Sequence, residues 1–159
     1  ALDNILPAYI PFTDFCFVKG TVSLNLTDTL VQVDWNDSND TKVGAAVTYN
    51  DSAGTFTLAT TGYYKVDAMF TFISQEAEER AAIIEFWGLG SGVGSGSQIA
   101  ALNNLTRHDS DDYSYSQIVF NCILNLSSGG SAYVFKARSL SDGTGALTST
   151  GYCCISRIS

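Results

Sequence analysis

The sequence predicts an all-β protein of about ten short strands packed as a sandwich or barrel. Apolar and polar residues alternate in several segments, which is the pattern of a strand with one buried face. Clusters of Gly, Asn, Asp and Ser separate these segments and mark turns. Lysine and glutamate, which are frequent in helical proteins, are scarce, and hydrophobic residues make up 45% of the chain. Its 159 residues are enough to bury a two-sheet core.

In the first half of the chain, the run 63–74 gives the clearest strand pattern. Its even-numbered positions from Tyr64 to Phe72 are apolar or small, whereas Lys65 and Asp67 point to the other face. Lys19-Gly20 is interpreted as a turn, and the Asn- and Asp-rich segment 34–42 as a loop. The strands expected in this half are 14–18, 21–26, 43–50, 55–60 and 63–74, with a turn at 50–54.

In the second half, segment 75–86 is the one place where a helix competes with a strand. We expect an acidic loop there, followed by a strand over 81–89, because Ile, Phe and Trp favour strands. The last strand is expected to be central in its sheet. The other strands expected in this half are 99–105, 113–126, 131–140 and 151–159, with loops at 90–98, 107–112 and 141–150.

The chain shows no internal repeat, so residues 9–159 are interpreted as one domain, and residues 1–8 as a lead-in from a stalk. Its four cysteines include no CxxC motif and there is one histidine, which argues against a zinc site. We interpret Cys16, Cys122, Cys153 and Cys154 as buried free thiols. The alternative is a disulfide from Cys16 to Cys153 or Cys154, since first and last strands are neighbours in many jelly rolls.

The formal net charge of −8 excludes two classes of partner. A nucleic-acid-binding protein needs a basic surface to displace counterions from phosphates, and an anionic membrane surface attracts basic segments. Neither is expected here. No stretch approaches the roughly 20 apolar residues that span a bilayer, so we expect no membrane insertion.

Three segments in order resemble the globular-head superfamily of complement component and tumour necrosis factor. The stretch 54–72, GTFTLATTGYYKVDAMFTF, resembles its strand, Gly-aromatic step and long alternating strand. The stretch 123–139, ILNLSSGGSAYVFKARS, resembles its next landmark, although Gly130, Ser131 and Ala132 stand where the family has a step containing Asp. The ending TGYCCISRIS, 150–159, resembles its closing strand. The resemblance covers roughly residues 40–159.

This resemblance implies a ten-stranded antiparallel jelly-roll sandwich that assembles as a homotrimer with a largely apolar axis. Such heads follow a stalk, bind receptors or glycans through loops, and are not enzymes. The Thr-, Ser- and Asn-rich, lysine-poor composition resembles a viral or phage fibre or spike head, or a bacterial surface protein. The resemblance therefore implies a location on a virion surface or outside the cell.

No residue pattern indicates catalysis. His108 is the only histidine, and no GxSxG elbow supports a Ser-His-Asp arrangement. The segment 88–96, GLGSGVGSG, lacks the Gly-Lys-Ser/Thr ending of a phosphate-binding loop. Carboxylates cluster at 34–40, 76–79 and 109–112, and we interpret them as solvated loops rather than glycosidase pairs. The spacing in 34–40 loosely resembles a calcium loop but lacks its Gly and terminal Glu, so no cofactor is expected and calcium is the minor alternative.

Candidate ligand contacts are residues of the polar loops. Trp35 is the leading candidate because aromatic rings give large contact area at low entropic cost; the alternative is a loop-anchoring Trp packed on the core. The candidate ligand-binding residues are Trp35, Asp37, His108, Tyr113 and Tyr115. The residues assigned to the core or the trimer axis are Tyr64, Phe70, Phe72, Phe120 and Tyr133.

The leading functional hypothesis is a trimeric head that attaches a virion or surface fibre to a receptor or glycan on a host cell, using several weak sites together. A purely structural trimerisation or capsid-decorating knob is the first alternative. A carbohydrate-active enzyme on a jelly roll is the second.

Overall fold

The computed structural model contains β-strands and no helix within the ranges that it describes. These ranges are residues 14–26, 29–35, 40–74, 80–89, 96–106, 114–139 and 145–158. The lead-in expected at residues 1–8 lies outside them. The strands are β1 (Phe15–Leu26), β2 (Val31–Gln32), β3 (Thr41–Val43), β4 (Val47–Asn50), β5 (Thr55–Leu58), β6 (Gly62–Ser74), β7 (Arg80–Leu89), β8 (Gly96–Thr106), β9 (Ser114–Leu126), β10 (Ser131–Ser139) and β11 (Gly145–Arg157).

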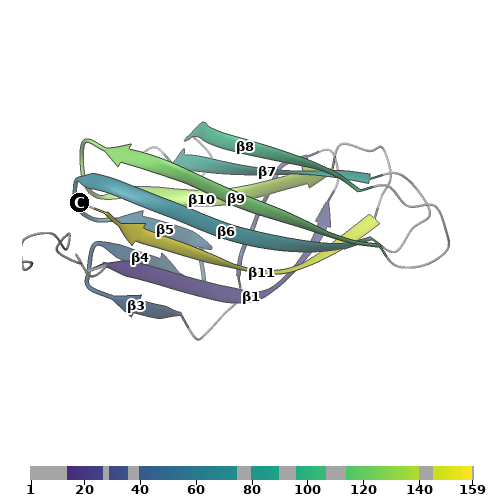
Figure 1. Cartoon of the computed structure of the whole chain (residues 1–159), viewed down its shortest axis with the longest axis horizontal. Coiled ribbons are helices and arrows are strands. Elements are labelled where there is room, and N and C mark those ends of the chain that lie inside the picture. The colour runs from purple at the N-terminus through teal and green to yellow at the C-terminus, as the bar shows by residue number, and fades with distance from the viewer. Residues whose placement is uncertain are drawn as a thin grey trace, which may run out of the picture.

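These strands form two antiparallel sheets that pack face to face (Figure 1). Sheet A has the order β3-β1-β11-β6-β9, and sheet B has the order β4-β5-β10-β7-β8 with β2 paired to β10. The central position expected for the last strand is confirmed, because β11 lies between β1 and β6. Several neighbours in each sheet are distant in sequence, so the chain passes from one sheet to the other. Within the described ranges no helix could cross a membrane.

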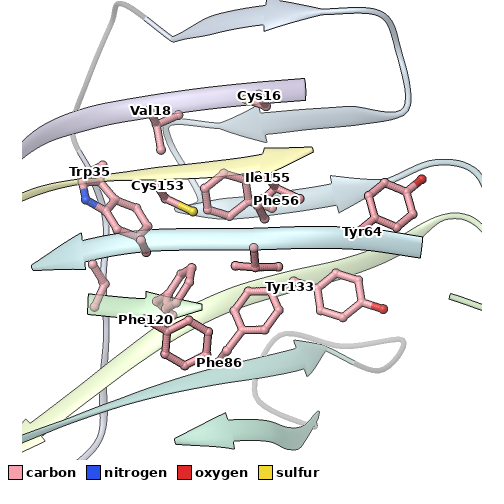
Figure 2. Close-up of a cluster of buried hydrophobic side chains, with 14 of the residues drawn as sticks. Cys16, Val18, Trp35, Phe56, Tyr64, Phe86, Phe120, Tyr133, Cys153 and Ile155 are labelled. Carbon is pink, nitrogen blue, oxygen red and sulfur yellow. The ribbon is translucent and has the colours of Figure 1, made fainter. Parts of the chain in front are cut away.

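The core lies between the sheets and is rich in aromatic rings (Figure 2). In β6 the expected alternation is confirmed, since Tyr64 and Phe70 are buried while Lys65 is exposed. Every second residue of a strand points to the same face, so one face of each sheet supplies these side chains. The aromatic residues with no exposed surface, or almost none, are Trp35, Phe56, Tyr64, Phe70, Phe86, Phe120 and Phe135.

The turn expected at Lys19-Gly20 is wrong, because both residues lie inside the continuous strand β1. Gly20 lies opposite Gly151 in a ladder that runs from Phe15 to Leu26. The loop expected at 141–150 is wrong in its second half, because β11 already begins at Gly145. In both cases the long antiparallel ladder between β1 and β11 overrides the local turn preference of Gly, Ser and Thr.

The strand expected at 43–50 is divided in two. Val43 ends β3, and β4 begins only at Val47. Gly44 between them has a φ of 76°, a left-handed conformation that favours glycine. The Asp14 carboxylate accepts hydrogen bonds from the backbone nitrogens of Ala45 and Ala46, at 3.0 and 3.1 Å, and fixes this bend. The short β2, which falls between the expected segments, was not predicted.

The segment where a helix competed with a strand is resolved in favour of the strand. Arg80–Leu89 forms β7, which pairs with β10 on one side and β8 on the other. Residues 75–79, expected as an acidic loop, lie outside the described residues. The remaining strands agree with their expected positions to within a few residues, except that β8 begins earlier, at Gly96.

Candidate functional site

The outer face of sheet A, which points away from sheet B, carries several large apolar side chains among polar and charged ones. Val119 and Ile123 of β9 are 61% and 68% exposed, although both are large hydrophobic residues. Across the sheet, Phe17 of β1 stacks on Tyr152 of β11 at a ring distance of 5.8 Å. We call this surface the apolar face and define it by the outward residues Phe17, Tyr63, Met69, Val119, Ile123, Tyr152 and Cys154.

One ion pair lies within the apolar face. Lys65 Nζ is 2.9 Å from Asp67 Oδ2, and the two side chains are 49% and 36% exposed. Ile123 lies opposite Lys65 in the ladder, and Cys154 lies opposite Asp67. Partial burial, and to a smaller degree the charge of Asp67, raise the pKa of the Cys154 thiol. On their other sides, Ser156 lies opposite Lys65 and Asn121 lies opposite Asp67, so each charged residue has one polar neighbour across the ladder. The two charges of the pair cancel.

The outer face of sheet B differs, because it carries charged groups around a tryptophan. Glu85 and Trp87 point outward from β7, since Ile84 and Phe86 between them point into the core. Lys136 points outward from β10, directly opposite Glu85 in the ladder. Arg138 is two residues further along β10 and shares this face. We call Glu85, Trp87, Lys136 and Arg138 the tryptophan cluster.

The contacts within the tryptophan cluster bury a carboxylate beneath the surface. Trp87 Nε1 donates a hydrogen bond of 2.7 Å to Glu85 Oε2, and Arg138 Nε lies 3.8 Å from Glu85 Oε1. Lys136 Nζ lies 4.1 Å from the centroid of the Trp87 ring, which is a cation–π contact. Glu85 is only 5% exposed, although it does not face the core. The Glu85 carboxylate thus fixes the orientation of the Trp87 indole, and the indole positions the Lys136 ammonium group.

This cluster was not predicted, although its residue pattern is present in the sequence. In β7 the residues facing away from the core are Ile83, Glu85 and Trp87, and in β10 they include Lys136 and Arg138. Charged and aromatic residues at every second position, on two strands that both have a buried face, indicate an unusual outer surface. The sequence alone does not show that these two strands are paired.

Trp35 does not lie on the surface as the leading ligand-contact interpretation requires. It is 0% exposed, with ring centroids 5.4 Å from both Phe70 and Phe135. Figure 2 shows its ring among the other buried side chains of the core. Its backbone nitrogen donates a 3.1 Å hydrogen bond to the Tyr49 hydroxyl. The structure therefore places Trp35 as the anchor of its loop, which is the alternative stated from the sequence; burial of its large apolar ring between the sheets is the physical reason.

The other predicted site residues are only partly described. The described residues do not include Asp37, His108 or Tyr113. The backbone of Tyr115 lies in β9, and its side chain is not described. Phe72 likewise belongs to β6 by its backbone, and its side chain is outside the described set. The structure places the side chains of Tyr64, Phe70, Phe120 and Tyr133 in the core between the sheets of one chain.

The four cysteines are free thiols, as the first interpretation expected, but only Cys16 and Cys153 are buried, whereas Cys122 and Cys154 are partly exposed. Cys16 lies opposite Ile155 in the ladder and Cys153 lies opposite Val18, so the two inward cysteines are not paired directly. Burial raises the pKa of Cys16 to about 12 and also raises that of Cys153.

In segment 34–40, which loosely resembles a calcium loop, Asp34 Oδ1 accepts a 3.0 Å hydrogen bond from the Tyr49 hydroxyl, and Asp37 is not described. Within the described part of the chain, no three His, Cys, Asp or Glu side chains are grouped as metal ligands.

Comparison with known proteins supports the fold and gives no closer relationship. No family model and no curated protein sequence matches the chain. Among solved structures, Eiger TNF from S. frugiperda is similar with a TM-score of 0.55 and 12% identity, covering 90% of this chain and 93% of that one. Murine APRIL has a TM-score of 0.55 and 14% identity, covering 90% and 98% respectively. The predicted fold class is therefore confirmed: two antiparallel sheets form a jelly roll like that of tumour necrosis factor.

Proposed function

We propose that this chain is the non-enzymatic, ligand-binding head of a homotrimer that acts outside the cell, on the fibre or spike of a virion or on another surface fibre. In this role it attaches the particle or fibre to a receptor or glycan of a host cell. The observation that carries the proposal is the apolar face of sheet A. The composition and the resemblance of its segments support the virion or fibre setting.

The apolar face has the chemistry of a contact between copies of this chain. Exposed apolar residues that gather on one face often mark a contact site, and Val119 and Ile123 are two such residues of this face. The whole chain carries a net charge of −8, so copies repel each other over most of their surface. The described charges on this face are Lys19, Lys65 and Asp67, which do not add to that repulsion. A second copy is therefore an electrostatically acceptable occupant.

A threefold assembly suits the position of this face at one side of the sandwich. Edge strand β9 carries the two most exposed apolar residues, Val119 and Ile123. If the β9 edge of one copy packs against the middle of sheet A in the next copy, the contact joins two different surfaces. Such a heterologous contact closes into a ring when its rotation permits. The similarity of fold to two tumour necrosis factor-like proteins supports three copies.

Light scattering coupled to size-exclusion chromatography tests the assembly. We expect the mass of three chains at micromolar concentration, and monomers for Ile123→Asp because the contact would bury an unpaired carboxylate. Ile99→Asp is the matched control, since Ile99 is an exposed apolar residue of β8 in sheet B, and it should leave the trimer intact. A stable wild-type monomer would contradict the proposal.

Ligand binding needs a separate test, because a purely structural knob would use the same apolar face. We expect the purified trimer to bind host-cell surfaces or an array of glycans more strongly than a monomeric Ile123→Asp variant does, since three weak sites act together. A trimer that binds no cell type and no glycan would support the structural knob and overturn the attachment function.

A further inference from the structure

The tryptophan cluster of sheet B holds two cationic side chains on a surface that assembly through sheet A leaves free. Lys136 and Arg138 occupy neighbouring outward positions of β10, roughly 7 Å apart along the strand. The whole chain has only eight Lys and Arg residues, so a quarter of its basic side chains lie on this small area of surface. Gln98, an exposed residue of β8, lies opposite Trp87 and adds amide donors and acceptors beside them.

The contacts inside the cluster leave hydrogen-bonding capacity on both cations. The distance of 3.8 Å from Arg138 Nε to Glu85 Oε1 is too long for a hydrogen bond. That nitrogen is buried and is closed to a ligand, whereas the Arg138 side chain is 35% exposed, so its terminal nitrogens are the donors that an anion could reach. Among the described residues no carboxylate lies within ion-pair distance of Lys136. Its contact with the Trp87 ring is electrostatic, so it leaves the N–H groups of the ammonium available as hydrogen-bond donors. An incoming anion could therefore be bound without breaking an existing hydrogen bond.

The buried carboxylate explains why this arrangement is rigid. Glu85 accepts the indole N–H of Trp87, so the ring orientation is fixed, and the ring then positions Lys136. A charge beneath the surface also attracts Arg138 to this place. An ion pair with a partly exposed arginine at this distance contributes little to folding stability. Stability alone therefore gives a weak reason for burying Glu85, whereas fixing a binding surface gives a stronger one.

We propose that the tryptophan cluster binds the carboxylate-bearing terminal sugar of a glycan. Lys136 and Arg138 would pair with the sugar carboxylate, the partly exposed Trp87 ring would contact its apolar C–H surface, and Gln98 would bond its hydroxyls. A single acidic sugar fits better than an extended polyanion, because the net charge of −8 repels long anionic chains. This inference rests on the proposed ligand-binding function, and it moves the ligand site from the loops to the outer face of sheet B.

Titration of the 159-residue chain with 3′-sialyllactose, and with lactose as the neutral counterpart, tests the proposal by calorimetry and tryptophan fluorescence. We expect millimolar binding of sialyllactose and binding of lactose that is at least about tenfold weaker. Lys136→Ala and Arg138→Ala should each weaken sialyllactose binding at least about fivefold. Lys42→Ala removes the same charge from an exposed position of β3 in the other sheet, and it should leave the affinity unchanged.

Fluorescence adds a readout that is specific to the site. The chain has two tryptophans, and Trp35 is wholly buried, so a ligand-induced change should come from Trp87 and disappear in Trp87→Phe. Equal binding of lactose and sialyllactose, or an equal effect of Lys42→Ala, would overturn the proposal. So would a folded protein that binds neither sugar, or one that binds a polyglutamate peptide instead.

Light scattering on the same samples separates this inference from the proposed function. A trimer that binds cells normally after Lys136→Ala and Arg138→Ala would retain the attachment function and exclude this site. A protein that is monomeric but still binds sialyllactose through Lys136 would retain this site and exclude the trimeric head.

Discussion

At the scale of single residues, the two tryptophans show that one fold can place the same side chain in opposite environments. Trp35 follows Val31 and Val33 at every second position, and all three turn toward the core. Trp87 alternates with Phe86 and therefore points away from it. The large apolar ring of Trp35 stabilises the sandwich by burial, whereas the partly exposed ring of Trp87 organises charged neighbours.

Removal of the Trp35 ring should destabilise the protein without affecting ligand binding. Trp35→Ala leaves a cavity between Phe56, Phe70 and Phe135, which costs about 3–5 kcal/mol of unfolding free energy. Trp35→Phe keeps an aromatic ring and removes the indole N–H, which has no partner here, so its cost should be clearly smaller. Urea unfolding followed by circular dichroism measures both. A Trp35→Ala variant as stable as the wild type would contradict the core position.

The buried thiol of Cys16 predicts a loss of stability at alkaline pH. Burial is the main cause that raises its pKa from 9.0 to about 12, so the folded state keeps a proton that the unfolded chain releases. The stabilisation is complete below about pH 9 and is lost as the pH rises toward 12. Cys153 acts in the same direction.

Urea midpoints at about pH 8 and about pH 10 test this linkage. Cys16→Ala should reduce the fall in unfolding free energy between the two pH values. Val18→Ala truncates a neighbouring buried residue that does not titrate, so it should lower stability and keep the wild-type pH dependence. If the two variants have the same pH dependence, Cys16 is not a source of the effect.

At the scale of the elements, the pairing of β1 with β11 decides features that local sequence does not. Gly20 and Gly151 lie opposite each other, and Gly151 also lies opposite Phe70 of β6. Lys19-Gly20 has the composition of a turn, yet the ladder carries the strand straight through it. A glycine inside a strand often marks a close approach of another backbone, and Gly151 does so here.

A side chain at Gly151 should break the contact between β11 and β6. A Cβ atom at this position would overlap the Met69 carbonyl oxygen, and backbone cannot move aside as a side chain can. We expect Gly151→Ala to cost about 3 kcal/mol or more in unfolding free energy. Gly88→Ala is the matched control, because its Cβ would lie 3.4 Å from side-chain atoms of Ile99 and Tyr133 and should cost less than about 1 kcal/mol. Chemical denaturation compares the two, and equal costs would contradict the close approach.

At the scale of the whole molecule, the two outer faces of the sandwich differ in their chemistry. In the proposed assembly, the apolar face of sheet A contacts other copies, whereas sheet B carries the tryptophan cluster and would remain open to a ligand. Within the apolar face, Lys65 and Asp67 would become buried on assembly. A buried ion pair adds little net affinity, but removal of one partner leaves an uncompensated charge in a dry contact.

Single substitutions in this pair should weaken the trimer more than the double substitution does. Asp67→Asn leaves Lys65 unpaired and should cost about 3–5 kcal/mol in association, whereas Lys65→Met with Asp67→Leu should restore or strengthen it. Analytical ultracentrifugation across a concentration series measures the association of the wild type, of Asp67→Asn and of the double variant. The Lys19→Ala variant changes a charge nearer one side of the same face and should have the smaller effect. A double variant that is weaker than Asp67→Asn would show that the pair contributes attraction of its own.

The sequence by itself determined the all-β class, most strand positions and the inward residues of β6 from Tyr64 to Phe70, because a period of two depends only on neighbouring positions. Phe70 and Phe120, which the sequence assigned to the core or the trimer axis, lie in the core. Tertiary structure decided the fate of Trp35, the continuity of β1 and the meeting of Glu85 with Lys136. The physical reason is that alternation assigns a side chain to one face of a strand, whereas the burial of that face and the identity of its neighbours follow from pairings between distant segments.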